Sequence, residues 1–175
     1  MKRTSKVLAT ILAFALIMCA VCCISVFAEG EGPALGYANV VYGDQISLAF
    51  TVEGYTGDGT VGIAVYKTEE SSSPMFASFE KKELEGVRYF ETFGIAAKDI
   101  DTVYYVAVAE KDADGNITAV SEKTAYSVAV YANDSIEALE GVEEPTDKQL
   151  AQLAVYEAIL NYNKAADAVI PAAAK

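Results

Sequence analysis

The sequence contains no histidine and no tryptophan, and its only cysteines, Cys19, Cys22 and Cys23, lie close to the N-terminus. Beyond these positions the chain has no imidazole base, no thiolate nucleophile, and no nitrogen and sulfur ligands for a zinc site. It also has no disulfide there, so its stability must come from a hydrophobic core. A chain of 175 residues is long enough to build one.

Basic side chains are also scarce. Only 13 Lys and Arg residues stand against 25 Asp and Glu residues, which gives a formal net charge of −12 at pH 7. A body of this charge repels nucleic acid phosphates and anionic lipid headgroups. We therefore expect no nucleic acid partner, and contact with a membrane only through an uncleaved N-terminal segment.

The N-terminal segment has the pattern of a secretory signal peptide. It begins with Lys2, Arg3 and Lys6, continues with apolar residues over 7–26, and ends in Val26-Phe27-Ala28, which suits the positions that a signal peptidase reads. We predict a signal peptide over residues 1–28 cleaved after Ala28, a linker over residues 29–33, and a secreted bacterial protein. The alternative is a membrane anchor through residues 7–26, because about 20 apolar residues can span a bilayer.

Residues 34–132 alternate between apolar and polar side chains with a period of two, which predicts β-strands. The alternation is clear over Ile46–Val52, whereas Val103–Ala109 is apolar throughout, as expected of a central strand that is covered on both faces. Further strands are expected at Val61–Val65, Val87–Phe93, Ile117–Val120 and Tyr126–Val130, with weaker candidates at Asn39–Tyr42 and Met75–Phe79. Short strands without long helices between them predict an antiparallel β-sandwich of the immunoglobulin or fibronectin type III kind.

Past residue 132 the apolar period becomes helical, and we predict a helical segment over residues 133–170 and a disordered tail over residues 171–175. A short helix occupies Asp134–Gly141, and a longer one starts with a capping box of Thr146 and Gln149. One face of the longer helix carries Leu150, Leu153, Tyr156 and Leu160. We expect this face to complete the chain's own core, the alternative being a helix of another chain.

Several short segments come in an order that a known group of proteins shares. These segments are Gly94–Ile100, Tyr104–Ala109, Asp112–Asn116, Tyr126–Tyr131 and Leu160–Ala166. Together with the signal peptide they resemble uncharacterised secreted proteins of gut-type clostridia, which carry a G-I-A-P-K-like turn, a Y-S-V-x-x-Y-A segment and an L-N-Y-x-x-A-A helix. Ala97 stands where that pattern has proline. The resemblance implies export and this architecture, and it carries over no catalytic residues.

A possible calcium loop overlaps the turn after the expected central strand. Glu110, Asp112 and Asp114 match the first ligand positions of such a loop, but its last position should be a bidentate carboxylate and falls on Ser121. The segment also lies between strands rather than helices. We interpret it as a hairpin turn around Asp114-Gly115, with a weak calcium site as the alternative and no other cofactor expected.

Two motif matches lack the context that their chemistry needs. Gly57–Gly62 fits G-x-G-x-x-G, but dinucleotide binding needs a helix after the loop, and the following residues have the pattern of a strand. Ser78 and Lys81 fit S-x-x-K, but in a strand side chains three residues apart face opposite sides. We interpret the first match as a turn and the second as coincidence.

Tyrosine is the compositional bias that points most directly to function, because the chain has 11 of them. An exposed tyrosine offers a flat apolar face and a polar tip, which suit stacking on a sugar ring or on a protein partner. Tyr55, in a Gly-rich turn, and Tyr66, opposite in facing to Val65, are the candidates that we expect to be exposed and to bind a ligand. The alternative is that tyrosine is simply a good strand former.

These observations lead to one functional hypothesis and two alternatives. The absence of an activated nucleophile, the tyrosine-rich sandwich and the export signal predict a secreted, non-catalytic binding module whose ligand is an extracellular protein or glycan. A carboxylate-dependent extracellular hydrolase, glycosidase-like in mechanism, is the first alternative. A structural component of the cell envelope is the second.

Overall fold

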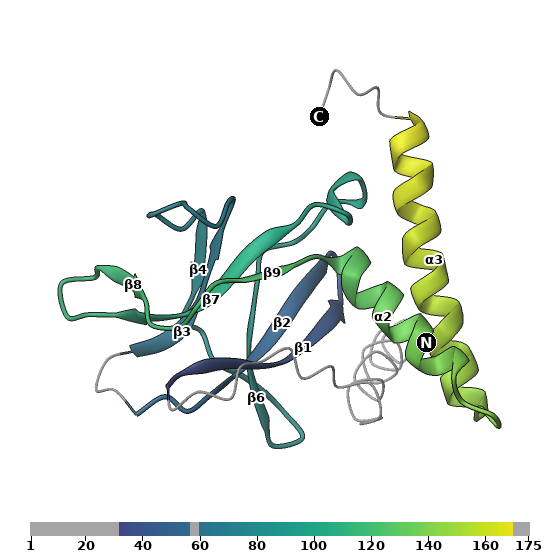
Figure 1. Cartoon of the computed structure of the whole chain (residues 1–175), viewed down its shortest axis with the longest axis horizontal. Helices are drawn as coiled ribbons and strands as arrows, with labels where there is room; N and C mark the ends of the chain where they lie inside the picture. The colour runs from purple at the N-terminus through teal and green to yellow at the C-terminus, as the bar shows by residue number, and fades with distance from the viewer. Residues whose placement is uncertain (1–31, 57–59, 170–175) are drawn as a thin grey trace, which may run out of the picture.

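The computed structural model describes residues 32–56 and 60–169. The predicted signal peptide with its cleavage site at Ala28, most of the linker, the first three residues of Gly57–Gly62 and the predicted tail lie outside the described residues. Within them, the chain forms two antiparallel β-sheets and two C-terminal α-helices that stand at one end of the sheets (Figure 1). The prediction of a mainly antiparallel β fold with a helical C-terminal segment is therefore confirmed.

The strand order of the described residues is β1-β2-β6-β5 in the first sheet and β4-β3-β7-β8 in the second, with β9 also paired to β7. The first sheet consists of β1 (Ala34–Tyr42), β2 (Ile46–Glu53), β6 (Val87–Glu91) and β5 (Lys82–Leu84). The second consists of β4 (Phe76–Ser78), β3 (Thr60–Tyr66), β7 (Tyr104–Lys111), β8 (Ile117–Ala119) and β9 (Thr124–Tyr126). Apolar side chains of both sheets, such as Phe50 and Ile63, meet in one shared core.

Strand β7 is covered on both faces, as its uniformly apolar sequence predicts. Val106 and Val108 belong to the core between the sheets, whereas Ala107 and Ala109 belong to a second cluster on the other face. All four side chains are completely buried. We call the second cluster the closed face, and its buried members are Ala64, Tyr66, Ala107 and Ala109.

Strands β8 and β9 pair with the two ends of β7 on the side away from β3. β8 pairs with Ala109–Lys111, and β9 pairs with Tyr104–Val106. Between them, the Ser121 hydroxyl accepts a hydrogen bond from the Val108 amide at 2.9 Å. The two strands thus act as one interrupted edge strand, and a serine side chain replaces a backbone acceptor at the interruption.

Helix α2 (Val128–Glu140) begins six residues before the predicted start at Asp134, so the strand expected over Tyr126–Val130 is wrong beyond Tyr126. Ser127 caps the helix, and its hydroxyl accepts a hydrogen bond from the Val130 amide at 3.0 Å. This N-cap satisfies a free amide and overrides the alternation of valines that suggested a strand. The predicted end is correct, because Gly141 follows the last helical residue.

The start of helix α3 (Asp147–Val169) is the predicted capping box. Gln149 Oε1 accepts a hydrogen bond from the Thr146 amide at 2.9 Å, and Thr146 Oγ1 accepts one from the Gln149 amide at 3.3 Å. The two side chains satisfy amides that the helix itself leaves free.

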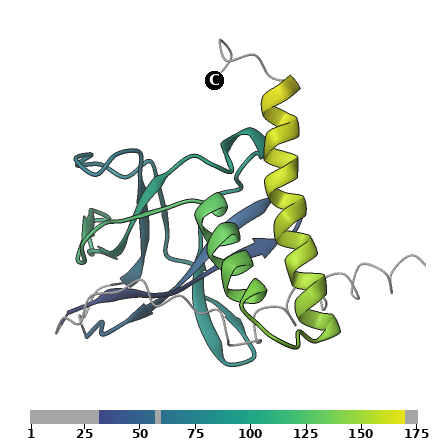
Figure 2. The same cartoon turned by 45° about the vertical axis from the view of Figure 1, so that its right-hand side comes forward.

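The buried face of α3 differs from the predicted one. It consists of Gln152, Tyr156, Ile159 and Asn163. Leu150 is 49% exposed, so only Tyr156 of the predicted stripe is fully buried. The helix packs on α2 and on the short 3-10 helix η1 (Ala97–Asp99), as Figure 2 shows, and the expectation that it docks on its own chain is confirmed.

Candidate functional site

The structure corrects the expectation that Tyr66 is exposed. Tyr66 does face away from Val65, but only 2% of it is accessible, because it belongs to the closed face. The Lys123 ammonium lies 4.3 Å from the centre of its ring and donates hydrogen bonds to the carbonyls of Glu69 and Ser71, the latter at 2.8 Å. Burial raises the pKa of the Tyr66 hydroxyl. A sugar or protein cannot stack on this ring while Lys123 covers it.

The second candidate, Tyr55, is half-buried in the loop that precedes β3. Tyr55 thus precedes the start of β3, and Tyr66 is the last residue of that strand. With Tyr66 covered, the two do not provide the joint patch of exposed rings that a recognition surface needs.

Other tyrosines pack the helices onto the first sheet. The Tyr131 and Tyr156 rings meet edge to face at 5.7 Å, and their hydroxyls lie 3.4 Å apart. The Tyr131 hydroxyl donates a hydrogen bond to Asn39 Oδ1 at 2.9 Å. Burial raises the pKa of both the Tyr131 and Tyr42 hydroxyls far above the usual value. Much of the tyrosine content therefore serves packing.

The residues proposed for calcium form a hairpin turn. Asp112 Oδ1 accepts hydrogen bonds from the amides of Asp114 at 2.9 Å and Asn116 at 2.8 Å, and Oδ2 accepts one from the Asn116 side-chain amide at 2.8 Å. The Asn116 hydrogen bonds, that of its side chain first, lower the pKa of Asp112. Gly115 has φ of 88°, as this turn requires. Among the described residues, no three His, Cys, Asp or Glu side chains, Glu110 included, are grouped so as to hold a metal ion.

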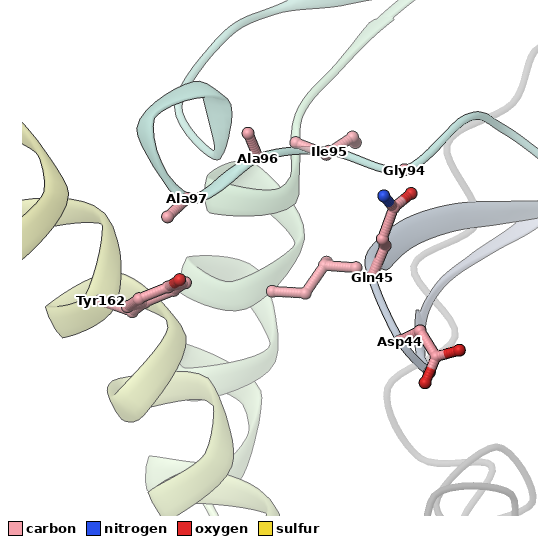
Figure 3. A pocket seen from close by; sticks show the side chains of 9 residues that line it. Asp44, Gln45, Gly94, Ile95, Ala96, Ala97 and Tyr162 are labelled. Carbon is pink, nitrogen blue, oxygen red and sulfur yellow. The ribbon is translucent and has the colours of Figure 1, made fainter.

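An open cavity lies where three segments distant in sequence meet, and its volume is about 370 Å³. The segments are the β1–β2 turn, the chain between β6 and η1, and one side of α3. Figure 3 shows Tyr162 of α3 facing the turn that carries Asp44 and Gln45. The lining residues are Gly43, Asp44, Gln45, Ile46, Gly94, Ile95, Ala96, Ala97 and Tyr162. We call this cavity the Tyr162 groove.

Backbone and side-chain hydrogen bonds fix the walls of the groove. The Ile95 amide donates to the Ile46 carbonyl at 2.6 Å and joins the two loop segments. The Asn163 side-chain amide donates to the Ala97 carbonyl at 3.0 Å and ties α3 to η1. Because Asn163 is buried and anchored, its neighbour Tyr162 is held at the rim, where 59% of it is exposed.

Gly94 and Gln45 make a close contact inside the groove. A Cβ atom at position 94 would overlap the Gln45 amide oxygen and would lie 2.9 Å from Gln45 Cβ. The glycine thus lets the Gln45 side chain lie directly against the backbone, as Figure 3 shows. The absence of a side chain at position 94 therefore decides where the Gln45 amide is presented.

A second hollow of about 310 Å³ adjoins the groove. It shares the lining residues Gly43, Asp44, Gln45 and Gly94, and extends to Ser47, Glu91 and Thr92. Both carboxylate oxygens of Glu91 are engaged, one by the Ser47 hydroxyl and the other by the Lys82 ammonium. The hydrogen bond to Glu91 raises the pKa of Lys82.

The groove offers the groups that a hydroxylated ring needs. Tyr162 presents an exposed aromatic face, and the Gln45 amide can both donate and accept hydrogen bonds. Asp44 also lines the cavity, and Figure 3 shows its carboxylate, which can accept hydrogen bonds, on the side of the turn away from Tyr162. Glycine and alanine line much of the remaining wall, so a ligand can approach the backbone closely. The volume of the groove falls in the range of about 300–1,000 Å³ that is typical of small-molecule pockets.

The sequence alone did not predict this site, although two of its parts lie in segments noted there. Gly94–Ile100 and Leu160–Ala166 meet here through the Asn163 to Ala97 hydrogen bond. The β1–β2 turn gave no signal, because Gly43, Asp44 and Gln45 are ordinary turn residues.

No protein-family model, curated protein or solved structure matches this chain. In the part of the chain that the structure describes, no helix combines the length and the apolar character needed to cross a membrane.

Proposed function

We propose that this chain is an exported, non-catalytic recognition module that binds a glycan of the cell exterior in the Tyr162 groove. The observation that carries the proposal is the exposed Tyr162 ring at the rim of a cavity that also presents Asp44 and Gln45. The scaffold in this proposal is an immunoglobulin-like or fibronectin-like sandwich. Export by a signal peptide cleaved after Ala28 is part of this proposal.

A glycan fits the groove better than an extended protein surface does. The groove is a local hollow with one exposed ring, and its polar groups suit hydroxyls on a compact ligand. Protein interfaces of standard size bury about 800 Å² per partner and depend on several anchors. An anionic glycan would also meet Asp44 and the net charge of −12, so a neutral or amine-bearing sugar is favoured.

The test is capture of sugars by the full chain produced in an exporting bacterial host. We expect binding to immobilised neutral glycans and to bacterial envelope material, with loss of at least about tenfold in affinity for Tyr162→Ala. Tyr37→Ala is the matched control, because Tyr37 is also exposed, at 46%, but does not line the groove. Equal loss in both variants, or none in either, would contradict a site at Tyr162.

Treatment of the envelope material separates the ligand classes. Periodate destroys vicinal diols of sugars and should abolish capture, whereas protease should leave it intact. The opposite result would point to a protein ligand. Co-fractionation of the chain with the envelope that neither Tyr162→Ala nor periodate disturbs would favour a structural component.

A hydrolase is the second candidate, because Asp44 and Glu91 both line the adjoining hollow. Glycosidases need a pair of carboxyl groups about 5–10 Å apart, one of which donates a proton. Glu91 is poorly suited to that role, since Ser47 and Lys82 already engage both of its oxygens. Release of reducing sugar that Asp44→Asn abolishes would replace the binding proposal with this one.

A further inference from the structure

The two adjoining hollows bear on the size of the ligand. The Tyr162 groove and the hollow beside Glu91 share four lining residues, and two of these are the glycines Gly43 and Gly94. Gln45, which lies against Gly94, lines both the space that Tyr162 borders and the space that Glu91 borders. The two spaces therefore adjoin at the β1–β2 turn and at Gly94.

We propose that the two hollows are consecutive subsites for a glycan of at least two sugar units, with Gln45 positioned by Gly94 to contact both units. This inference rests on the proposed function. The first unit stacks on Tyr162, and the second enters the hollow lined by Ser47, Glu91 and Thr92. Asp44 lines both spaces and can accept hydrogen bonds from hydroxyls of either unit.

The electrostatics of the second subsite define the kind of sugar that it accepts. Glu91 is already paired with Lys82. Its carboxylate is therefore not free to bind a cationic group of a ligand in this hollow. An acidic sugar would meet both Asp44 and Glu91. The second subsite is therefore expected to take a neutral, hydroxyl-bearing unit, bound by hydrogen bonds and close packing against glycine.

The experiment compares single sugars with their own dimers on the full chain. The probes are glucose, mannose, galactose and N-acetylglucosamine, each with a homodimer (cellobiose, mannobiose, galactobiose and chitobiose) and with galacturonic acid as the acidic probe. Ligand-observed NMR and calorimetry measure affinity. For the sugar that binds best, we expect its dimer to bind about tenfold more tightly than the monomer, and galacturonic acid to bind more weakly than galactose.

Gly94→Ala tests the role of Gln45 at the junction. The added methyl group overlaps the end of the Gln45 side chain, which can move, and would lie 2.9 Å from Gln45 Cβ, so a small backbone shift accompanies it; circular dichroism checks that the variant stays folded. We expect the dimer to lose most of its roughly tenfold advantage over the monomer, and the monomer itself to bind more weakly, because Gln45 also lines the groove that holds the first unit. Gln45→Ala removes the same amide without adding a methyl group and should reproduce the effect.

The outcomes separate this inference from the proposed function. Monomer and dimer binding with equal affinity, both dependent on Tyr162, would overturn the second subsite and leave the binding module intact. A dimer advantage that Gly94→Ala and Gln45→Ala leave unchanged would overturn the role of Gln45. Binding of no sugar by the folded chain would overturn the glycan-binding function itself, and the subsites with it.

Discussion

Two aromatic surfaces of this molecule differ in what lies over the ring. On the closed face, the Lys123 ammonium covers Tyr66 at 4.3 Å from the ring centre. At the groove, Tyr162 is 59% exposed and faces a cavity. In the first case the chain supplies its own cation to the ring, and in the second the face stays accessible to solvent. The comparison teaches that tyrosine content does not by itself mark a binding surface, since a neighbouring side chain decides whether a ring is available.

The largest expected effect comes from removing each ring in turn. Tyr66→Ala leaves a cavity under a buried cluster and should lower the free energy of unfolding by about 3 kcal/mol. Tyr162→Ala removes an exposed side chain and should change it by less than about 0.5 kcal/mol, while lowering glycan affinity at least about tenfold. Urea unfolding measures both values. Comparable losses of stability would show that the two surfaces do not differ in this way.

The two surfaces can also be compared by adding a methyl group to a glycine in each of them. At Gly62, a Cβ would overlap the Ser78 carbonyl and lie 2.7 Å from the Phe79 ring, so backbone must move. Gly62→Ala should therefore cost about 2 kcal/mol in urea unfolding. Gly94→Ala overlaps the movable end of the Gln45 side chain and lies 2.9 Å from Gln45 Cβ, so it should cost less than Gly62→Ala, about 1 kcal/mol. If Gly94→Ala were the more harmful change, the groove would be the more rigid of the two surfaces.

The covering cation can be removed while its hydrocarbon stem is largely retained. Lys123→Met deletes the contact with Tyr66 and the hydrogen bonds to the Glu69 and Ser71 carbonyls, and should cost about 1 kcal/mol. Lys111→Met is the control, because its ammonium lies 4.9 Å from the Phe79 ring without those carbonyl bonds. It should cost about half as much. Urea unfolding and the NMR signals of the Tyr66 ring test the pair, and equal costs would assign the effect to the ring contact alone.

Local chemistry explains which parts of the fold the sequence predicts well. The apolar run of β7, the Thr146–Gln149 capping box and the Asp114-Gly115 turn each depend on neighbours in the chain, and all three are confirmed. Val128 and Val130 misled the prediction, because alternating valines fit a strand, whereas a cap at Ser127 starts a helix. In the sequence the Ser127 cap is a weaker signal than the alternating valines, but in the fold its hydrogen bond decides that a helix forms.

The candidate site could not be predicted because its parts come from distant segments. Tyr162 has the spacing of a helix-core residue, and only the rotation of α3, set by buried Gln152 and Asn163, turns it outward. The covering of Tyr66 likewise depends on Lys123, which lies far along the chain. Strand alternation correctly predicts that Tyr66 lies on the face opposite Val65. It does not predict that Tyr66 is buried, because exposure depends on which other segments pack on that face.

The smallest effect concerns charge rather than aromatic rings, and it compares two aspartates. Asp112 is held by the Asn116 side chain and by turn amides, which lower its pKa, whereas Asp44 lines the groove. A folded-state pKa below the unfolded value gives stability that is present above about pH 4 and is lost as the pH falls through the lowered pKa. Thermal melts from pH 7 to pH 2.5 should therefore show Asp112→Asn below the wild type at neutral pH, with the gap closing in acid. Asp44→Asn is measured beside it, as the variant of the aspartate that lines the groove. A gap for Asp112→Asn that widened in acid would mean that the turn does not depend on the charged carboxylate, and the contrast between a side chain engaged by its own chain and one open to a ligand would then hold for the rings alone.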